Sequence, residues 1–362
     1  MTIEYGMKDG MLLWVRNPFN GTVTYFNDVH RKPHVFGLLT NPQHPAALRP
    51  LAPHDLRDEM ERVRHACVFC PGNEAMTMEE VMRVTYGEMY ESTAMPSGFH
   101  GDDWAIRVVR NIIPRVPEEC TGGRNESYVI IEDGRHFLPG ATGLSDLMWS
   151  GVLPAQHYYH LLRIAAAVVR RSLDNPAVQS VLIRKHQGRE SGASQPHIHL
   201  QAIGADRVFP DVERDMEVTA RHPHIWHESV ALMRECGLHI EEGDGIASQW
   251  SPFGKFGRHF EVIALEDCQP LPDIPDTRLR LFAQYTHRLL RALGTAPYDL
   301  EIHHGEGIPL HLHLHGRRYV YANIGGTLNA PADVAENVVA PTRDIVRLLA
   351  LQTAEEEQRW QG

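Results

Sequence analysis

The stretch SGASQPHIHLQ, residues 191–201, decides the fold, because it joins a loop of small residues to a strand in which polar and apolar residues alternate. Alternate side chains of a strand project from the same face. His197, His199 and Gln201 therefore project together. Three polar groups on one face of an otherwise apolar strand are costly to bury without a function. We interpret this segment as an active-site strand.

The loop that precedes this strand, residues 188–194, is rich in glycine and serine. Small residues let backbone N–H groups approach an anion and form a concave phosphate site. The donors expected for such an anion are the backbone amides of Gly192 and Ala193 and the side chains of Ser191, Ser194 and Arg189. A loop of this composition is usually a plain turn. Next to a histidine strand, we interpret it as a phosphate cradle that faces a nucleophile.

The pattern around this strand occurs twice. A helix expected at residues 157–173 is followed by a β-rich segment, the small-residue loop and the histidine strand. A second helix, expected at 277–293, is followed by YDLEIHH, a short loop and LHLHLHG. A repeat of this size indicates gene duplication, and chance similarity of two α+β halves is the alternative. The boundary is expected in the polar helical stretch after Gly204.

Two further groups are candidates for a function. His311, His313 and His315 share one face of the second histidine strand. Cys67 and Cys70 have the C-x-x-C spacing of half a zinc site, whose other ligands must be histidines or carboxylates from elsewhere. A redox pair is the competing interpretation, but the Pro-Gly-Asn that follows Cys70 favours a turn over a helix start.

Composition limits the partners. The 362 residues carry a formal net charge of −11 with no basic block, which argues against nucleic acid but allows a small anionic substrate. No apolar run approaches the roughly 20 residues that span a bilayer, and the N-terminus has no secretion signal. Five cysteines, an odd number, argue against a disulfide framework. We therefore expect a cytoplasmic protein without a membrane partner.

Taken together, CVFCPGNE (67–74), WAIRVVRNIIPRV (104–116) and SGASQPHIHLQ (191–201) resemble motifs of the galactose-1-phosphate uridylyltransferase branch of the histidine-triad superfamily. The resemblance extends from about Arg16 to about Asn329. It implies a duplicated α+β fold whose two histidine-triad-like halves, 1–205 and 206–362, have mainly antiparallel, half-barrel-like sheets flanked by helices. It also implies a homodimer.

The resemblance implies roles for individual residues. His199 matches the nucleophilic histidine of the family, Gln201 the glutamine that holds the phosphoryl oxygens, and Ser194 the phosphate-binding serine. The ligands of the family's Zn²⁺ site match Cys67, Cys70, His197 and His136, the last at the end of a strand. Ligation of His197 would fix the strand so that His199 is correctly aimed.

A second metal ion, Zn²⁺ or Fe²⁺, is implied at the second histidine strand. Its expected ligands are His311 and His313, then His304 or its neighbour His303, and a carboxylate from Glu213 or Glu217. Two phosphate-binding positions differ from the common family pattern: His186 stands where relatives commonly have Asn, and Arg31 belongs to a reduced basic pair near the N-terminus.

The implied reaction is nucleotidyl transfer. Neutral His199 would attack the α-phosphorus of a nucleotide sugar or a similar donor, and the nucleotidyl-histidine would pass its nucleotide to a sugar phosphate, with ping-pong kinetics. A neutral amide at Gln201 cannot pass a proton to a leaving alkoxide, which suits a phosphate leaving group. A phosphorylase or hydrolase of nucleotide sugars or dinucleoside polyphosphates with the same nucleophile is the alternative. A non-catalytic, zinc-stabilised nucleotide-binding protein is the second alternative.

Overall fold

The computed structural model describes residues 3–8, 11–19, 23–26, 53–90, 96, 98–112, 114–143, 146–188, 191, 193, 195–251, 253, 259–295, 297–316 and 334–337. The chain divides into two compact units, residues 42–208 and residues 1–41 with 209–362. The first 41 residues thus group with the C-terminal half, whereas the motifs led us to assign all of 1–205 to the N-terminal half.

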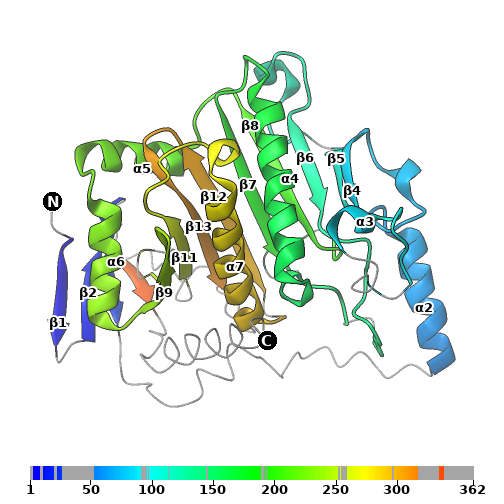
Figure 1. The fold of residues 1–362 in the computed structure, drawn as a ribbon, viewed down its shortest axis with the longest axis horizontal. Helices are drawn as coiled ribbons and strands as arrows, with labels where there is room; N and C mark the ends of the chain where they lie inside the picture. Colours follow the sequence, from blue (N-terminus) through cyan, green and yellow to red (C-terminus); the bar gives the residue numbers. More distant parts are fainter. Residues whose placement is uncertain are drawn as a thin grey trace. The chain divides into compact units, whose positions relative to one another are not determined.

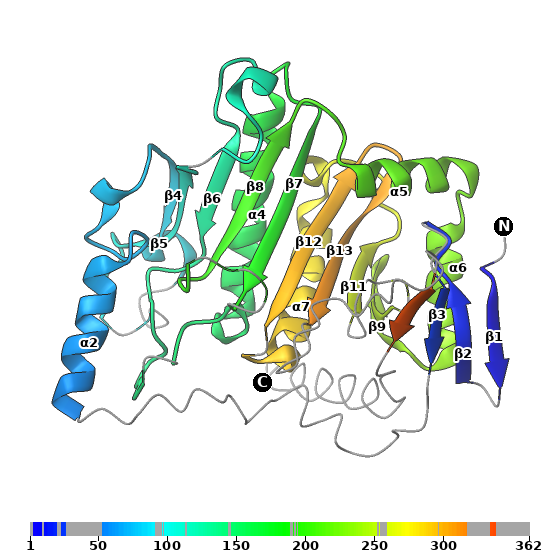
Figure 2. The same ribbon diagram turned by 180° about the vertical axis from the view of Figure 1, so that it is seen from behind.

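The unit formed by residues 42–208 contains a five-stranded antiparallel sheet with the order β4-β5-β6-β8-β7. Its strands are β4 (Glu80–Thr85), β5 (Trp104–Arg110), β6 (Ser127–Ile131), β7 (Ser180–Gln187) and β8 (His199–Ala205). Its helices are α2 (Pro53–Ala66), α3 (Tyr86–Met89) and α4 (Ala155–Leu173). Helix α4 packs on β7 and β8, in front of the strands in Figure 1 and behind them in Figure 2.

The other unit contains a second five-stranded antiparallel sheet, with the order β9-β10-β11-β13-β12. Its strands are β9 (His239–Gly243), β10 (Ile246–Trp250), β11 (His259–Ala264), β12 (Tyr298–Gly305) and β13 (Ile308–Gly316). Its helices are α5 (Pro210–Arg221), α6 (Ile225–Cys236) and α7 (Asp276–Leu293), of which α7 packs on β10 and β11 (Figure 1).

A small separate sheet also belongs to this unit. Its order is β1-β2-β3-β14, and β14 lies parallel to β3. The strands are β1 (Tyr5–Lys8), β2 (Met11–Arg16), β3 (Val23–Phe26) and β14 (Val334–Asn337). None of the helices in the described part of the chain is both long and apolar enough to cross a membrane.

The two five-stranded sheets have the same topology. In each, three consecutive strands are followed by a long helix and two further strands, and the fifth strand inserts between the third and the fourth. The helices begin and end within two residues of the ranges expected from periodicity. The predicted duplicated α+β fold is therefore confirmed, with open, mainly antiparallel sheets. Strands β8 and β13, which carry the alternating histidines, hold the same place in the two copies.

Strand β8 is buried along its whole length, which is why both of its faces matter to the site. A Cβ atom built on Gly204 would lie 2.5 Å from the Ser172 hydroxyl of α4, so the even-numbered residues of β8 face that helix. Because strand side chains alternate, His199 and Gln201 project from the opposite face. Phe69 of the C-x-x-C segment contacts this face, its ring 5.3 Å from that of His199.

Candidate active site and metal-binding clusters

Two thiols and two imidazoles gather beside β8. The potential ligand atoms of Cys67, Cys70, His136 and His197 all lie within 4.8 Å of one another, and all four residues are buried. The His197 Nδ1 atom is 3.6 Å from both sulfur atoms, and the His136 Nδ1 atom is 3.3 Å from Cys70 Sγ. The predicted Cys₂His₂ set is thus brought together as a cluster that could bind a metal ion.

The ring of His197 is oriented for ligation by Nδ1. Its Nε2 atom lies 2.7 Å from the backbone carbonyl of Asp133, which can only accept a hydrogen bond, so Nε2 carries the proton. The lone pair of Nδ1 then faces the thiols. Metal-binding histidines usually donate their second N–H in this way. The donor types and this orientation fit a zinc ion.

The C-x-x-C segment forms a tight turn around the cluster. The Cys70 amide donates to the Cys67 carbonyl over 3.1 Å, and the Asn73 side-chain amide donates to the same carbonyl over 2.8 Å. A hydrogen bond from Cys70 holds the pKa of the Cys67 thiol far below its ordinary value, while that bond and burial raise the pKa of Cys70. The pair therefore shares one proton, which a metal ion would displace.

His136 reaches the cluster from a loop. Strand β6 ends at Ile131, and His136 follows five residues later, next to an isolated bridge between Phe137 and Leu147. The expectation that His136 ends a strand was therefore wrong, although its ring lies in the cluster. The Glu132 amide still donates to the Ile198 carbonyl over 3.1 Å, and the Asp133 carbonyl lies 2.7 Å from His197 Nε2, so the segment before His136 stays beside the residues that lead into β8.

His199 is buried with one ring nitrogen fixed. Its Nδ1 atom lies 2.8 Å from the His197 carbonyl, which must accept the proton, so Nε2 holds the lone pair. Burial lowers the pKa of His199 to about 4, with a smaller contribution from the charge of Lys185. The imidazole is neutral at ordinary pH, which is the state a nucleophile needs.

Gln201 lies on the same face as His199 and is nearly buried. Arg184 of β7 is opposite Gln201 in the strand register, and its Nε atom is 3.4 Å from the Gln201 amide oxygen. The half-buried His186 shares the face of Arg184, because it is two residues along the same strand. Arg184 was not predicted, although its place between a predicted strand and the loop offered the signal of a cation on the active face.

The loop before β8 is described only in part. Ser191 is buried, and its hydroxyl has no hydrogen-bond partner among the described residues. The Ala193 amide donates to the Gly188 carbonyl over 3.3 Å. It therefore forms a hydrogen bond within the loop and is not directed at an anion. The other predicted phosphate ligands, Arg31, Arg189, Gly192 and Ser194, lie outside the described residues.

A buried ion pair lies behind β8, on the face that α4 covers. The Lys185 ammonium donates to Glu132 and, over 2.5 Å, to the Ser150 hydroxyl, which itself donates to Glu132. His157 of α4 contacts the Glu132 carbonyl over 2.5 Å. Lys185 is in phase with the buried Val181 and Ile183 of β7. That alternation is the signal in the sequence for a buried lysine.

A second cluster lies on β12, β13 and α5. It consists of Asp215, His303, His311 and His313. One carboxylate oxygen of Asp215 is 2.8 Å from His303 Nδ1 and 3.2 Å from His311 Nε2. Burial opposes ionisation of Asp215, but the hydrogen bonds from His303 and His311 outweigh it and hold its pKa below the usual range. Three imidazoles and a carboxylate could also hold a metal ion.

The structure corrects two expected ligands of this second set. His303 belongs to it and His304 does not, because neighbouring side chains of a strand point to opposite faces and His303 is opposite His311. The carboxylate comes from Asp215, on the buried face of α5, whereas Glu213 and Glu217 are exposed. Helical periodicity contained this information, since residue 215 is in phase with the apolar residues Val212 and Val218.

No family model matches the sequence, and no curated protein matches it significantly. An ADP-glucose phosphorylase from Arabidopsis thaliana, solved with bound ADP-glucose, is 16% identical with a TM-score of 0.59, over 78% of this chain and 88% of that protein. A GalT-like protein from the same plant is 17% identical with a TM-score of 0.58, over 78% and 91%. A uridylyltransferase is 17% identical with a TM-score of 0.56, over 76% and 95%.

The chain has the uridylyltransferase fold. This confirms at the level of the fold the resemblance that the motifs predicted. In this structure the C-x-x-C segment, His136 and the segment that leads into β8 meet at one cluster, although Cys70 and His197 are 127 positions apart in the sequence.

We predict that Cys67→Ser removes about one equivalent of bound metal per chain, since a single lost thiolate typically weakens a four-ligand site strongly. Elemental analysis of the purified protein would measure the change. Cys268→Ser, which alters an exposed lone cysteine, is the matched control and should leave the metal content unchanged. Equal metal content in both variants would contradict the assignment.

We predict that Lys185→Met lowers the free energy of unfolding by about 3–5 kcal/mol, because it leaves the buried Glu132 carboxylate without its partner. The double variant Lys185→Met/Glu132→Gln should recover most of that loss, since neither charge then remains. Urea unfolding of the two single variants and the double variant would measure the coupling. Additive losses would show that the pair does not act as a unit.

Proposed function

We propose that the chain is a nucleotidyltransferase that uses His199 Nε2 as its nucleophile. The single observation that supports this most is the fixed orientation of His199: its Nδ1 proton is donated to the His197 carbonyl, so the lone pair is on Nε2. A strand that holds a neutral, buried imidazole in one tautomer is prepared for attack on phosphorus without rearrangement.

In the proposed reaction, His199 Nε2 attacks the α-phosphorus of a nucleotide sugar or a similar nucleotide donor. The N–P bond forms while the bond from phosphorus to the bridging oxygen breaks, and the leaving sugar phosphate takes the electron pair. A second phosphate then attacks the nucleotidyl-histidine and restores the imidazole. Gln201, held beside Arg184, would bind the phosphoryl oxygens, with Ser194 and the buried Ser191 hydroxyl as further donors.

We assign the Cys₂His₂ set to a structural Zn²⁺ ion. Two thiolates and two imidazoles complete a tetrahedral shell, which leaves no position for water or substrate. We propose that this ion holds His197 in place. The His197 carbonyl in turn holds the ring of His199. The second set, around Asp215, is proposed to hold Zn²⁺ or Fe²⁺, whose chemistry lies outside the nucleotidyl transfer.

A phosphorylase is the second candidate, because it would use the same nucleophile with inorganic phosphate as the acceptor. One of the proteins with this fold is an ADP-glucose phosphorylase. The donor step is common to both candidates, and only the acceptor separates them. The homodimer and the cytoplasmic location stay predictions from the resemblance.

Intact-mass measurement after brief mixing with UDP-, ADP-, GDP-, CDP- or dTDP-glucose tests the proposal. We expect one donor to add a single nucleoside monophosphate to the protein. His199→Ala should lose this adduct completely, because no other group can replace the imidazole. His100→Ala, an exposed histidine of the same unit, is the matched control and should keep it.

The isolated adduct then identifies the acceptor. Release by glucose 1-phosphate or galactose 1-phosphate, with no release by inorganic phosphate, identifies the transferase, and the reverse identifies the phosphorylase. An adduct that persists in His199→Ala, or no adduct with any donor, contradicts the proposed nucleophile.

A further inference from the structure

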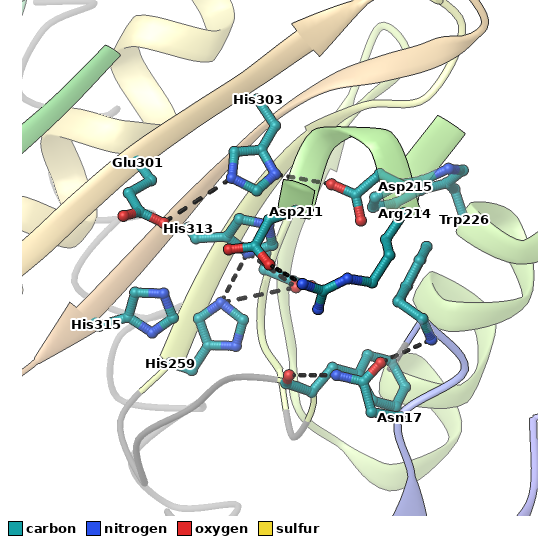
Figure 3. Close-up of a pocket in the computed structure, with 13 residues that line it drawn as sticks. Asn17, Asp211, Arg214, Asp215, Trp226, His259, Glu301, His303, His313 and His315 are labelled. Carbon is teal, nitrogen blue, oxygen red and sulfur yellow. Dashed lines mark hydrogen bonds and ion pairs between the residues drawn. The ribbon is translucent and has the colours of Figure 1, made fainter. Parts of the chain in front are cut away.

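A third group of ligand atoms lies beside the Asp215 set and shares His313 with it. It consists of His259, Glu261 and His313, on the neighbouring strands β11 and β13. His313 is directly opposite Glu261 in the strand register, and His259 is opposite His315. Figure 3 shows the rings of His259, His313 and His315 together on one side of the pocket that Asp215 and His303 also line.

The spacing of these atoms is that of ligands around one ion. His259 Nε2 is 2.9 Å from His313 Nδ1, and Glu261 Oε1 is 3.4 Å from His313 Nδ1 and 3.8 Å from His259 Nε2. Metal–ligand bonds of about 2.0–2.2 Å in a tetrahedral arrangement place two ligand atoms roughly 3.3 Å apart. The three observed separations lie around this value.

The surroundings hold this group in place. Gln249 donates to Glu261 Oε2 over 2.9 Å, which turns Oε1 towards the two imidazoles. The ring of His259 stacks on that of His315, with centroids 4.4 Å apart and an angle of 12° between the planes. His259 and Glu261 are 1% and 3% exposed. A buried carboxylate without a full counter-charge is costly, so such a fixed arrangement calls for a cation.

The charges that line the pocket also exceed what one cation balances. Four carboxylates line it, those of Asp211, Asp215, Glu261 and Glu301, against one guanidinium, that of Arg214. Arg214 is paired with Asp211 over 3.2 Å. Three carboxylates are then left among the lining residues. A single divalent ion at the Asp215 set would leave one negative charge, and Glu261 is the carboxylate on the far side of His313.

We propose that His259, Glu261 and His313 form an additional divalent-cation site, so that this pocket holds two metal ions that share His313. Nitrogen and carboxylate donors in this combination suit Zn²⁺, Fe²⁺, Co²⁺ or Mn²⁺. His313 presents Nδ1 to the new site, and in the proposal its Nε2 binds the ion of the Asp215 set. Bridging through both nitrogens requires loss of the N–H proton to solvent. The site lies in a different unit from His199. Metal binding there is a property separate from the proposed nucleotidyl transfer.

Metal counting on the full chain tests this. The protein is loaded with Co²⁺, freed of excess ion on a desalting column and assayed by elemental analysis. We expect three equivalents per chain, one for each ligand set. Glu261→Gln, which keeps the size and the hydrogen-bonding of the side chain, and His259→Ala should each bind two. His239→Ala, a histidine of the same sheet outside the pocket, is the control and should bind three.

Electron paramagnetic resonance of the Co²⁺-loaded protein gives a second readout. Two ions that share an imidazole should show spin coupling, which Glu261→Gln abolishes while circular dichroism stays unchanged. Two equivalents in the unaltered protein, with no loss in Glu261→Gln or His259→Ala and no coupling, would overturn the proposal. Glu261 and His259 would then only orient His313 as a ligand of a single ion. The nucleotidyl adduct on His199 is measured separately by mass, so failure here is distinct from failure of the proposed reaction.

Discussion

The site depends on two hydrogen bonds that join ring nitrogens to backbone carbonyls just before the start of β8. Asp133 accepts from His197, and His197 accepts from His199. The first bond directs the His197 lone pair to the two thiols, and the second leaves the His199 lone pair on Nε2. Both acceptors are main-chain atoms, one two residues after β6 and the other two residues before β8, so rotation of either ring breaks its hydrogen bond. The two bonds therefore link the Cys₂His₂ cluster to the ring of the proposed nucleophile.

The duplication places a similar strand in a different chemical setting. Strand β8 has a Cys₂His₂ cluster beside it, a buried ion pair behind it and a single histidine available for chemistry. Strand β13 has the same place in its sheet, but its histidines meet Asp215 from α5 and Glu261 from β11. Carboxylates in place of thiols make β13 suitable for divalent ions with nitrogen and oxygen ligands. The second copy thus keeps the framework and, in our proposal, carries metal ligands where the first carries the nucleophile.

Local patterns predicted much of the fold. Alternation along HIHLQ and HLHLH identified both histidine strands, and helical periodicity identified α4 and α7 to within two residues. The residues that reach the sites from distant elements were harder to predict from the sequence. Asp215 and Lys185 could have been found from the phase of their own helix or strand, whereas Glu261 required the register of β11 against β13. His136 lies in a loop, whose path depends on tertiary contacts that no local pattern contains. The grouping of residues 1–41 with the C-terminal half likewise has no sequence signal that we could identify.

The central claim is that the metal cluster holds the nucleophile in position through His197. Removal of the metal with a chelator under native conditions, followed by intact-mass measurement with the donor that labels the untreated protein, tests it most directly. The account predicts that the nucleotidyl adduct falls in proportion to the metal bound by the Cys₂His₂ set and returns when Zn²⁺ is restored, with circular dichroism unchanged throughout. Full adduct formation at the original rate by protein whose Cys₂His₂ set has been emptied would contradict it.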